Sequence, residues 1–292
     1  MSRARRLLEL GSLVVRPFPV PIAHRAGSVL GSLVGRLDHE RLAVLQRNIA
    51  LVRPDLTEAE HRALAIDGFA SYGRYWAETL RLPTLSPTTI DRGFHVEGYE
   101  HIRRARAEGR GPVMVLPHLG GWEWAAAWLG RVADIEVTAV VEPLEPHDVA
   151  EWFAHLRASY GINVVPLGPS ALGEVVTATK RLDVVCLLAD RDLSGSGIEV
   201  DFFGARTTLP AGPALVARRT GAPLLPTAVY FDGERRLCRI RPPVPVDRDG
   251  RLRADLTSTT QRLARELEVL IEAAPDQWHV LAPIAEPART VR

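Results

Sequence analysis

The sequence predicts an α/β fold with three layers, in which a central, mostly parallel or mixed sheet is flanked by helices. Short runs rich in valine, isoleucine and leucine alternate with longer segments of helical periodicity along residues 94–292. The chain has 292 residues, of which 46% are hydrophobic, so it can bury a large core. We therefore expect a single domain over residues 1–292, with an N-terminal helical part at 1–82 and an α/β core at 94–292.

The N-terminal part has the apolar spacing of helices. Between residues 35 and 52, apolar side chains recur with a near-helical period. Thr57, with Glu60 three residues later, is the expected N-cap of a further helix that stops before Pro83. In the core we expect strands at 113–116, 135–141, 162–166, 184–189, 198–203, 224–231 and 237–241. Helices are expected at 122–133, 148–160, 171–181, 211–220 and 257–274.

Charge is distributed unevenly along the chain. The formal net charge of +1 argues against a general nucleic-acid-binding protein. Residues 1–53, however, contain nine arginines and three acidic residues, mixed with leucines and valines. This composition suits a helix lying on an anionic membrane surface, and an ordinary amphipathic helix packed on its own domain is the alternative.

No stretch of the chain reaches the roughly 20 apolar residues that a membrane span needs. The N-terminus is a poor signal peptide, because Glu9 and Arg16 interrupt its apolar part. We therefore expect a peripheral protein on the cytoplasmic face of the cell membrane. Cys186 and Cys238 stand alone within apolar runs and the histidines have no ligand spacing, so no metal site is expected.

The candidate catalytic residues begin with His118 and Glu123. An apolar run at 112–117 leads to His118, two glycines follow, and Glu123 comes five residues after the histidine. A histidine at the end of a strand, with a carboxylate nearby, is typical of a general base and its orienting partner. Positions five apart on a helix differ by about 140°, so the two side chains meet only if Gly120 and Gly121 bend the chain. A glutamate that stabilises a helix N-terminus is the alternative for Glu123.

A second acidic segment runs from Asp190 to Asp201. A predicted strand ends at Asp190 and Arg191, and Glu199 alternates with Ile198 and Val200 in the next one. Alternation places Glu199 on the face opposite these apolar residues. Glu199 would stabilise the protonated form of His118 if that face points inward, whereas a solvent-facing glutamate on an edge strand is the alternative.

These motifs resemble a known family. The segment His118-Leu-Gly-Gly-Trp-Glu123 resembles the histidine–acid box of the lysophospholipid acyltransferase superfamily, in the branch of the lipid A biosynthesis acyltransferases. The segments 190–192, 200–204 and 210–213 resemble the same branch. Residues 46–49, 71–76 and 275–280 are most similar to the actinobacterial phosphatidylinositol mannoside acyltransferases, although those relatives often carry Asp where this chain has Glu123.

The resemblance implies the transfer of a long acyl chain, similar to palmitoyl, from acyl-CoA to a mannose 6-hydroxyl of a phosphatidylinositol mannoside. Acyl-CoA is then a co-substrate, and no further cofactor is expected. It also implies that His118 is the base, that Glu199 completes a relay with it, and that Arg157 contacts acyl-CoA. Asp190 and Arg191 belong to the implied substrate-binding motif. Transfer to a lipid A precursor or another glycolipid, and hydrolysis by a thioesterase or esterase, are the alternative functions.

The residues themselves agree with direct transfer. His118 would take the proton of a sugar hydroxyl as it attacks the thioester, and either Glu199 or Glu123 would fix the imidazole. Backbone N–H groups near Gly120 and Gly121 are candidates for binding the oxyanion. Trp122, Trp124 and Trp128 could wall a groove for the acyl chain, with core packing as the alternative, which is favoured for Trp128.

Overall fold

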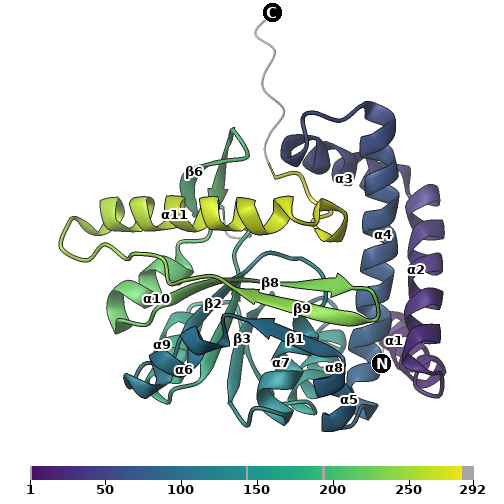
Figure 1. Ribbon diagram of the computed structural model, residues 1–292, viewed down its shortest axis with the longest axis horizontal. Coiled ribbons are helices and arrows are strands. Elements are labelled where there is room, and N and C mark those ends of the chain that lie inside the picture. Colours follow the sequence, from purple (N-terminus) through teal and green to yellow (C-terminus); the bar gives the residue numbers. More distant parts are fainter. Residues whose placement is uncertain (1, 143, 193–194, 285–292) are drawn as a thin grey trace, which may run out of the picture.

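The computed structural model describes residues 2–142, 144–192 and 195–284. Within them, seven strands form one sheet in the order β1-β9-β8-β2-β5-β3-β4, and β6 and β7 form a separate hairpin (Figure 1). The strands are β1 (Phe94–Glu97), β2 (Val113–Leu116), β3 (Val137–Val141), β4 (Ile162–Pro166), β5 (Val184–Leu188), β6 (Ile198–Phe202), β7 (Ala205–Leu209), β8 (Leu224–Asp232) and β9 (Arg235–Ile240). All neighbouring pairs in the large sheet are parallel except β8 with β9. The expected α/β class and mixed, mostly parallel sheet are confirmed.

Helices cover both faces of this sheet. After the N-terminal helices come α5 (Pro87–Arg92), α6 (Tyr99–Ala107), α7 (Trp122–Arg131), α8 (His147–Ala158), α9 (Ala171–Lys180), α10 (Gly212–Thr220) and α11 (Leu252–Glu272). Short 3-10 turns lie at Leu82–Thr84 and at Pro275–Gln277. Figure 1 shows α11 lying along one side of β8 and β9, with α7 and α8 on the other side.

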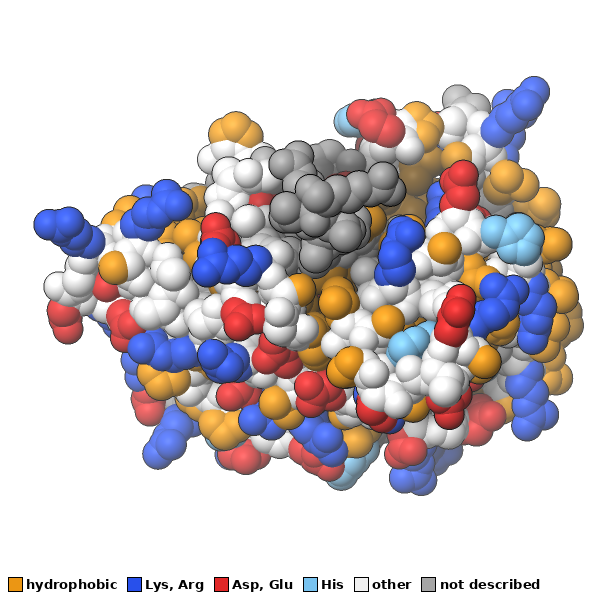
Figure 2. Space-filling model, turned by 90° about the horizontal axis from the view of Figure 1, so that it is seen from above, with side chains coloured by type: hydrophobic (Ala, Val, Ile, Leu, Met, Phe, Trp, Pro, Cys, Tyr) orange, Lys and Arg blue, Asp and Glu red, His pale blue; other side chains and the backbone are white. Residues whose placement is uncertain are grey.

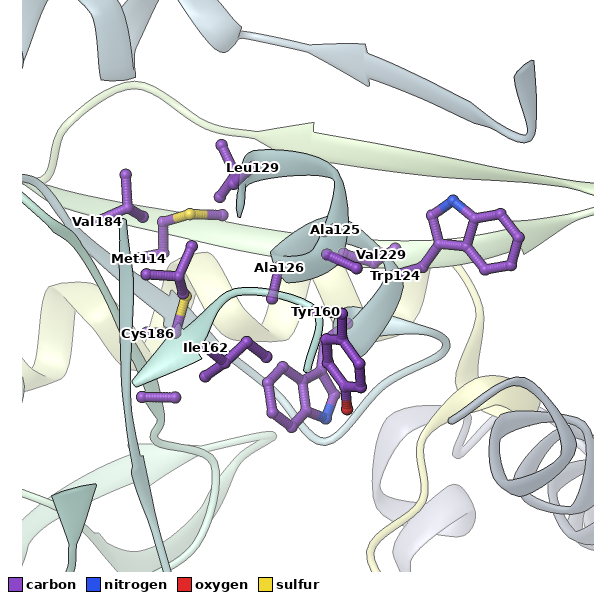
Figure 3. Close-up of a cluster of buried hydrophobic side chains, with 14 of the residues drawn as sticks. Met114, Trp124, Ala125, Ala126, Leu129, Tyr160, Ile162, Val184, Cys186 and Val229 are labelled. Carbon is purple, nitrogen blue, oxygen red and sulfur yellow. The ribbon is translucent and has the colours of Figure 1, made fainter. Parts of the chain in front are cut away.

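Alternation along β2 explains the three layers. Met114 and Leu116 join one buried cluster with residues of α7 and α8, whereas Val113 and Val115 join another with residues of α9, α10 and α11. Successive side chains of a strand point to opposite faces, so a strand covered on both sides must be apolar throughout. Figure 3 shows the first of these clusters, with Met114, Trp124 and Tyr160 among its labelled members.

The N-terminal part consists of α1 (Arg3–Val15), α2 (Val20–Leu37), α3 (His39–Val52) and α4 (Glu58–Arg81), which stand beside the sheet in Figure 1. Helix α4 begins with the predicted capping box of Thr57 and Glu60. Helices α2 and α4 approach very closely. A Cβ at Gly73 would lie 2.1 Å from the carbonyl oxygen of Gly27, so this crossing requires glycine. No helix among the described residues is both long and apolar enough to cross a bilayer.

The element predictions failed where the sequence lacked a strong apolar pattern. Strand β1 was not predicted because only alternate residues of its four are partly buried, and β7 was not predicted because its sequence, ARTTL, is mostly polar. Helix α11 begins at Leu252 rather than near residue 257. The division into a single domain over 1–292 stays a prediction, and residues 285–292 lie outside the described part of the chain.

Candidate active site

His118 and Asp190 are brought together by two neighbouring parallel strands. The register of β2 and β5 pairs Leu116 with Leu188. His118 lies two positions after Leu116, and Asp190 lies two positions after Leu188. The carboxyl ends of parallel strands meet at one edge of the sheet, which is where open α/β sheets bind their ligands. Because both residues lie the same number of positions beyond a pair of neighbouring residues, the imidazole lies directly beside the carboxylate.

Asp190 holds His118 through two hydrogen bonds. Its Oδ1 lies 2.6 Å from His118 Nδ1, and its Oδ2 accepts the backbone N–H of His118 at 2.8 Å. The indole N–H of Trp278 donates to the same Oδ2 at 2.7 Å. Asp190 and Trp278 are both fully buried, whereas the His118 side chain is 26% exposed.

These contacts fix the charge of Asp190 and the tautomer of His118. Burial acts to raise the pKa of Asp190, but the charge of His118 and the hydrogen bonds from His118 and Trp278 outweigh it, and the pKa lies below its ordinary value. The carboxylate is therefore ionised at neutral pH, and its Oδ1 accepts a hydrogen bond from the Nδ1–H group of His118. A neutral His118 then carries its lone pair on Nε2, as a general base must.

The turn after His118 is fixed by the rest of the fold. Gly120 has φ of +58°, and a Cβ there would lie 1.9 Å from the carbonyl oxygen of Val229. Its N–H donates to Gln277 O at 3.0 Å, and the N–H of Gly121 donates to Val229 O at 3.0 Å. The expectation that these two N–H groups bind an oxyanion is therefore wrong, because both are already engaged within the protein.

A cavity of about 580 Å³ opens beside His118. One part is apolar and is bordered by side chains of β3, β5, α9 and α10. The other part is aromatic and polar. The members of the apolar part include Val140, Leu172, Val175, Leu187, Leu215 and Val216, and those of the other part include Tyr72, Tyr75, Trp122, Phe153, Arg157 and His279. A volume of this size and a mostly apolar lining are typical of small-molecule sites.

Glu123 has no hydrogen bond to His118 and lies instead in a buried cluster that includes two residues of the cavity wall, Tyr75 and Arg157. Its Oε1 accepts hydrogen bonds from Arg157 Nε at 3.0 Å, from Arg157 Nη2 at 2.7 Å and from Tyr75 at 3.2 Å. Its Oε2 accepts the hydroxyl of Tyr160 at 2.6 Å. Since its side chain is only 2% exposed, this ion pair is isolated from solvent. The expected partnership of Glu123 with His118 is therefore wrong, and the residue holds Arg157 instead.

Arg157 borders the cavity, as a contact to acyl-CoA would require, and that contact stays a prediction. Its guanidinium lies 5.4 Å from the centre of the Trp122 ring and 5.6 Å from that of Phe153. Burial lowers the pKa of Arg157, but the charge of Glu123 outweighs it and the pKa is raised. Arg157 is thus a fixed cation between two aromatic rings.

Glu199 lies on the β6–β7 hairpin, away from His118. The strand alternates as expected, but Glu199 is on its solvent face: its side chain is 65% exposed and pairs with Arg206 at 2.7 Å. The relay of Glu199 with His118 is therefore corrected, because Asp190 already occupies Nδ1. The alternative of a solvent-facing glutamate describes its position.

The remaining candidates are divided between the cavity and the core. Arg191 borders the cavity and pairs with Glu142 at 2.8 Å. Trp122 also borders it, whereas Trp124 is buried beneath Arg236, whose guanidinium lies 3.7 Å from its ring centre. Trp128 packs against Phe94 and Tyr99. Of the three tryptophans, only Trp122 can wall the groove.

Sequence reasoning missed the role of Asp190 as partner of His118 and the contribution of residues 277–279. The first had a signal, because both residues follow their strands at the same interval. The second had only the family resemblance of residues 275–280 as a signal, since contacts between positions more than 80 residues apart depend on tertiary structure.

Comparison with known proteins identifies the family. Residues 7–284 match the bacterial lipid A biosynthesis acyltransferase family. The chain belongs to this family. It is therefore an O-acyltransferase of glycolipid biosynthesis.

Individual members of the family differ in their sequence identity to this chain. The chain is 37% identical over 244 residues to a phosphatidylinositol mannoside acyltransferase of Mycobacterium tuberculosis, covering 82% of this chain and 75% of that protein. It is 36% identical to the protein of the same description from Mycolicibacterium smegmatis, with 82% and 78% covered. The lipid A biosynthesis lauroyltransferase of Escherichia coli is 28% identical, with 93% and 88% covered.

Proposed function

We propose that this acyltransferase moves a long fatty acyl chain from acyl-CoA to the 6-hydroxyl of a mannose of a phosphatidylinositol mannoside. The observation that carries the proposal is the His118–Asp190 pair at the border of a cavity with an apolar part. The greater identity to the mycobacterial enzymes than to the lipid A enzyme favours a mannoside acceptor.

In this proposal the apolar part of the cavity holds the acyl chain and the sugar approaches His118 from the aromatic part. His118 Nε2 takes the hydroxyl proton while the hydroxyl oxygen attacks the thioester carbonyl, and Asp190 stabilises the resulting imidazolium. The tetrahedral intermediate collapses, the C–S bond breaks, and the proton on His118 passes to the leaving thiolate of CoA. A positioned base contributes about 10²–10⁴-fold to such a reaction.

The reaction is proposed to take place at the cytoplasmic surface of the membrane. Large apolar side chains of α1 and α2 are 44–79% exposed, and arginines stand among them; Figure 2 shows hydrophobic and basic side chains together along the right-hand edge, where α2 lies. The apolar members are Leu7, Leu10, Leu13 and Val14 of α1 with Ile22, Val29, Leu30, Leu33, Val34 and Leu37 of α2. Such a surface suits the interface of an anionic bilayer.

The test is mass spectrometry of the products formed from palmitoyl-CoA and a panel of acceptors, namely phosphatidylinositol mono- and dimannosides and a lipid A precursor. We expect an acylated mannoside that loses the acyl group from the mannose C6 oxygen on fragmentation. CoA release that is equally fast without any acceptor would indicate a thioesterase, and product from the lipid A precursor alone would indicate the other acceptor. His118→Ala should abolish turnover without changing the circular dichroism spectrum.

A further inference from the structure

The turn beside His118 offers no free backbone donor for the oxyanion of the reaction. The N–H groups of Leu119, Gly120 and Gly121 donate to the carbonyl oxygens of Pro117, Gln277 and Val229. The thioester oxygen nevertheless gains negative charge during the attack, and in acyl transfer a preorganised donor at that oxygen is usually the largest single contribution to the rate. A side-chain donor at the border of the cavity, close to His118, would meet this need.

His279 occupies the required position. Leu119 and Trp278 form an antiparallel bridge, which sets His279 directly opposite His118, and the N–H of His279 donates to His118 O at 2.7 Å. Opposite residues of an antiparallel pair project from the same face, with Cβ atoms about 4.5–5.5 Å apart. Both histidines border the cavity, whereas Leu119 and Trp278, which alternate with them, are buried in the core.

The proton of His279 can be located by following its hydrogen bonds. Its Nε2 lies 2.8 Å from Ser71 Oγ, the only hydrogen bond that Ser71 Oγ makes within the described chain. Burial, and then the charge of His118, lower the pKa of His279 to about 3, so the ring is neutral at pH 7. If Ser71 donates its hydroxyl proton to Nε2, as its lack of another acceptor indicates, the single ring proton is on Nδ1.

No described residue accepts a hydrogen bond from His279 Nδ1. Nδ1 is also not one of the polar atoms that are both sealed from solvent and without a partner. Since the ring borders the cavity, this N–H is available to a bound substrate. A neutral imidazole is well suited to the task, because it donates a hydrogen bond to a carbonyl oxygen without giving up its proton.

We propose that His279 is a second catalytic residue, whose Nδ1–H group donates a hydrogen bond to the thioester oxygen as it becomes an oxyanion. The inference rests on the proposed acyl transfer and adds one step to it. As the hydroxyl oxygen forms its bond to the carbonyl carbon, the π electrons move to the carbonyl oxygen and His118 takes the hydroxyl proton. His279 stabilises that oxygen until the C=O bond re-forms and CoA leaves.

Two substitutions of His279 and one of Ser71 test the proposal. His279→Leu removes the donor, whereas His279→Gln restores an N–H group on a side chain of similar reach. Ser71→Ala removes the hydroxyl that fixes the tautomer. For each variant, kcat and both KM values are measured for transfer from palmitoyl-CoA, together with the slow hydrolysis of palmitoyl-CoA in the absence of acceptor, and folding is followed by thermal unfolding.

We expect His279→Leu to lower kcat about 100- to 1000-fold, the loss typical of an oxyanion donor, with KM values nearly unchanged. His279→Gln should recover part of that loss, and Ser71→Ala should lower kcat by roughly tenfold, the equivalent of one weakened hydrogen bond. Hydrolysis without acceptor should fall in parallel, because it forms the same oxyanion.

The proposal is overturned if His279→Leu raises the KM of the acceptor and leaves hydrolysis unchanged, since the residue would then bind the sugar. It is also overturned if the Gln and Leu variants are equally slow at temperatures where both are folded. A wild-type protein that hydrolyses palmitoyl-CoA but acylates no mannoside contradicts the proposed acceptor instead, and the hydrolysis rates of the variants still report on His279.

Discussion

Trp278 donates its indole N–H to the same oxygen of Asp190 that accepts the backbone N–H of His118, at 2.7 Å and 2.8 Å. The last described segment of the chain therefore fixes a carboxylate that lies 88 residues earlier in the sequence. Because Trp278 is fully buried and does not line the cavity, it acts on the reaction through Asp190.

Trp278→Phe should lower kcat about tenfold, since a hydrogen bond to a charged group contributes about 1.5–3 kcal/mol and only part of it bears on the transition state. The measurement is kcat across pH, at a temperature well below the unfolding midpoint of the variant. A purely structural tryptophan would lower the midpoint and leave kcat and its pH profile unchanged.

Glu123→Gln should destabilise the fold by about 3–5 kcal/mol, because it leaves the Arg157 cation buried without its partner. Urea unfolding measures this change, and Glu199→Gln is the matched control at an exposed ion pair, where about 0–1 kcal/mol is expected. Equal stability losses in the two variants would contradict the assignment of Glu123 to the buried wall. Replacing Glu123 and Arg157 together by glutamine should recover part of the loss.

Stability should fall as the pH is lowered below about 6.5, because buried histidines must be neutral in the folded protein. Burial lowers the pKa of His24 to about 4, despite the opposing charge of Glu78. Between the ordinary value and pH 4 the unfolded chain therefore binds a proton that the folded chain does not, and acidification favours unfolding by about 1.4 kcal/mol per pH unit for such a group.

The measurement is urea unfolding of wild type and His24→Asn at pH 7, 6 and 5. In the variant, the slope of the unfolding free energy against pH should be smaller by the contribution of one proton, about 1.4 kcal/mol per pH unit. His279, whose pKa is lowered to about 3, continues to contribute to the slope in both proteins. An identical pH dependence in both proteins would contradict a neutral, buried His24.

The exposed apolar surface of α1 and α2 should govern binding to membranes. Replacing Leu30 and Leu33 by glutamate removes two exposed leucines and adds two negative charges, so binding to vesicles of anionic phospholipid should weaken at least tenfold. Leu252→Glu is the matched control, since Leu252 is 50% exposed at the start of α11. Sedimentation with vesicles measures binding, and equal retention of both variants would reject this surface as the membrane contact.

Much of the fold was predictable because strands buried on both faces are continuously apolar. Residues 113–116 and 162–166 have the predicted bounds, and the mixed, mostly parallel sheet follows from strands alternating with helices. His118 was predictable for the same reason, since it is the first polar side chain beyond β2. Its partner was harder to identify, because Glu123 and Glu199 are as close to apolar segments as Asp190 is, and the equal interval after the two strands has meaning only once the strands are known to pair. Only the register of β2 with β5 distinguishes the three acids.

In the proposed reaction Asp190, rather than Glu123 or Glu199, orients the imidazole of His118 and stabilises the imidazolium that forms. The most direct test compares kcat for acyl transfer in Asp190→Asn and Glu199→Gln under identical conditions. We expect a loss of about 10⁴-fold for Asp190→Asn, the size seen when the carboxylate of a serine-protease triad becomes an amide, and a change of no more than about twofold for Glu199→Gln. A folded Asp190→Asn variant that keeps wild-type turnover, or a Glu199→Gln variant that loses it, would show that Asp190 is not the partner of His118 in the reaction.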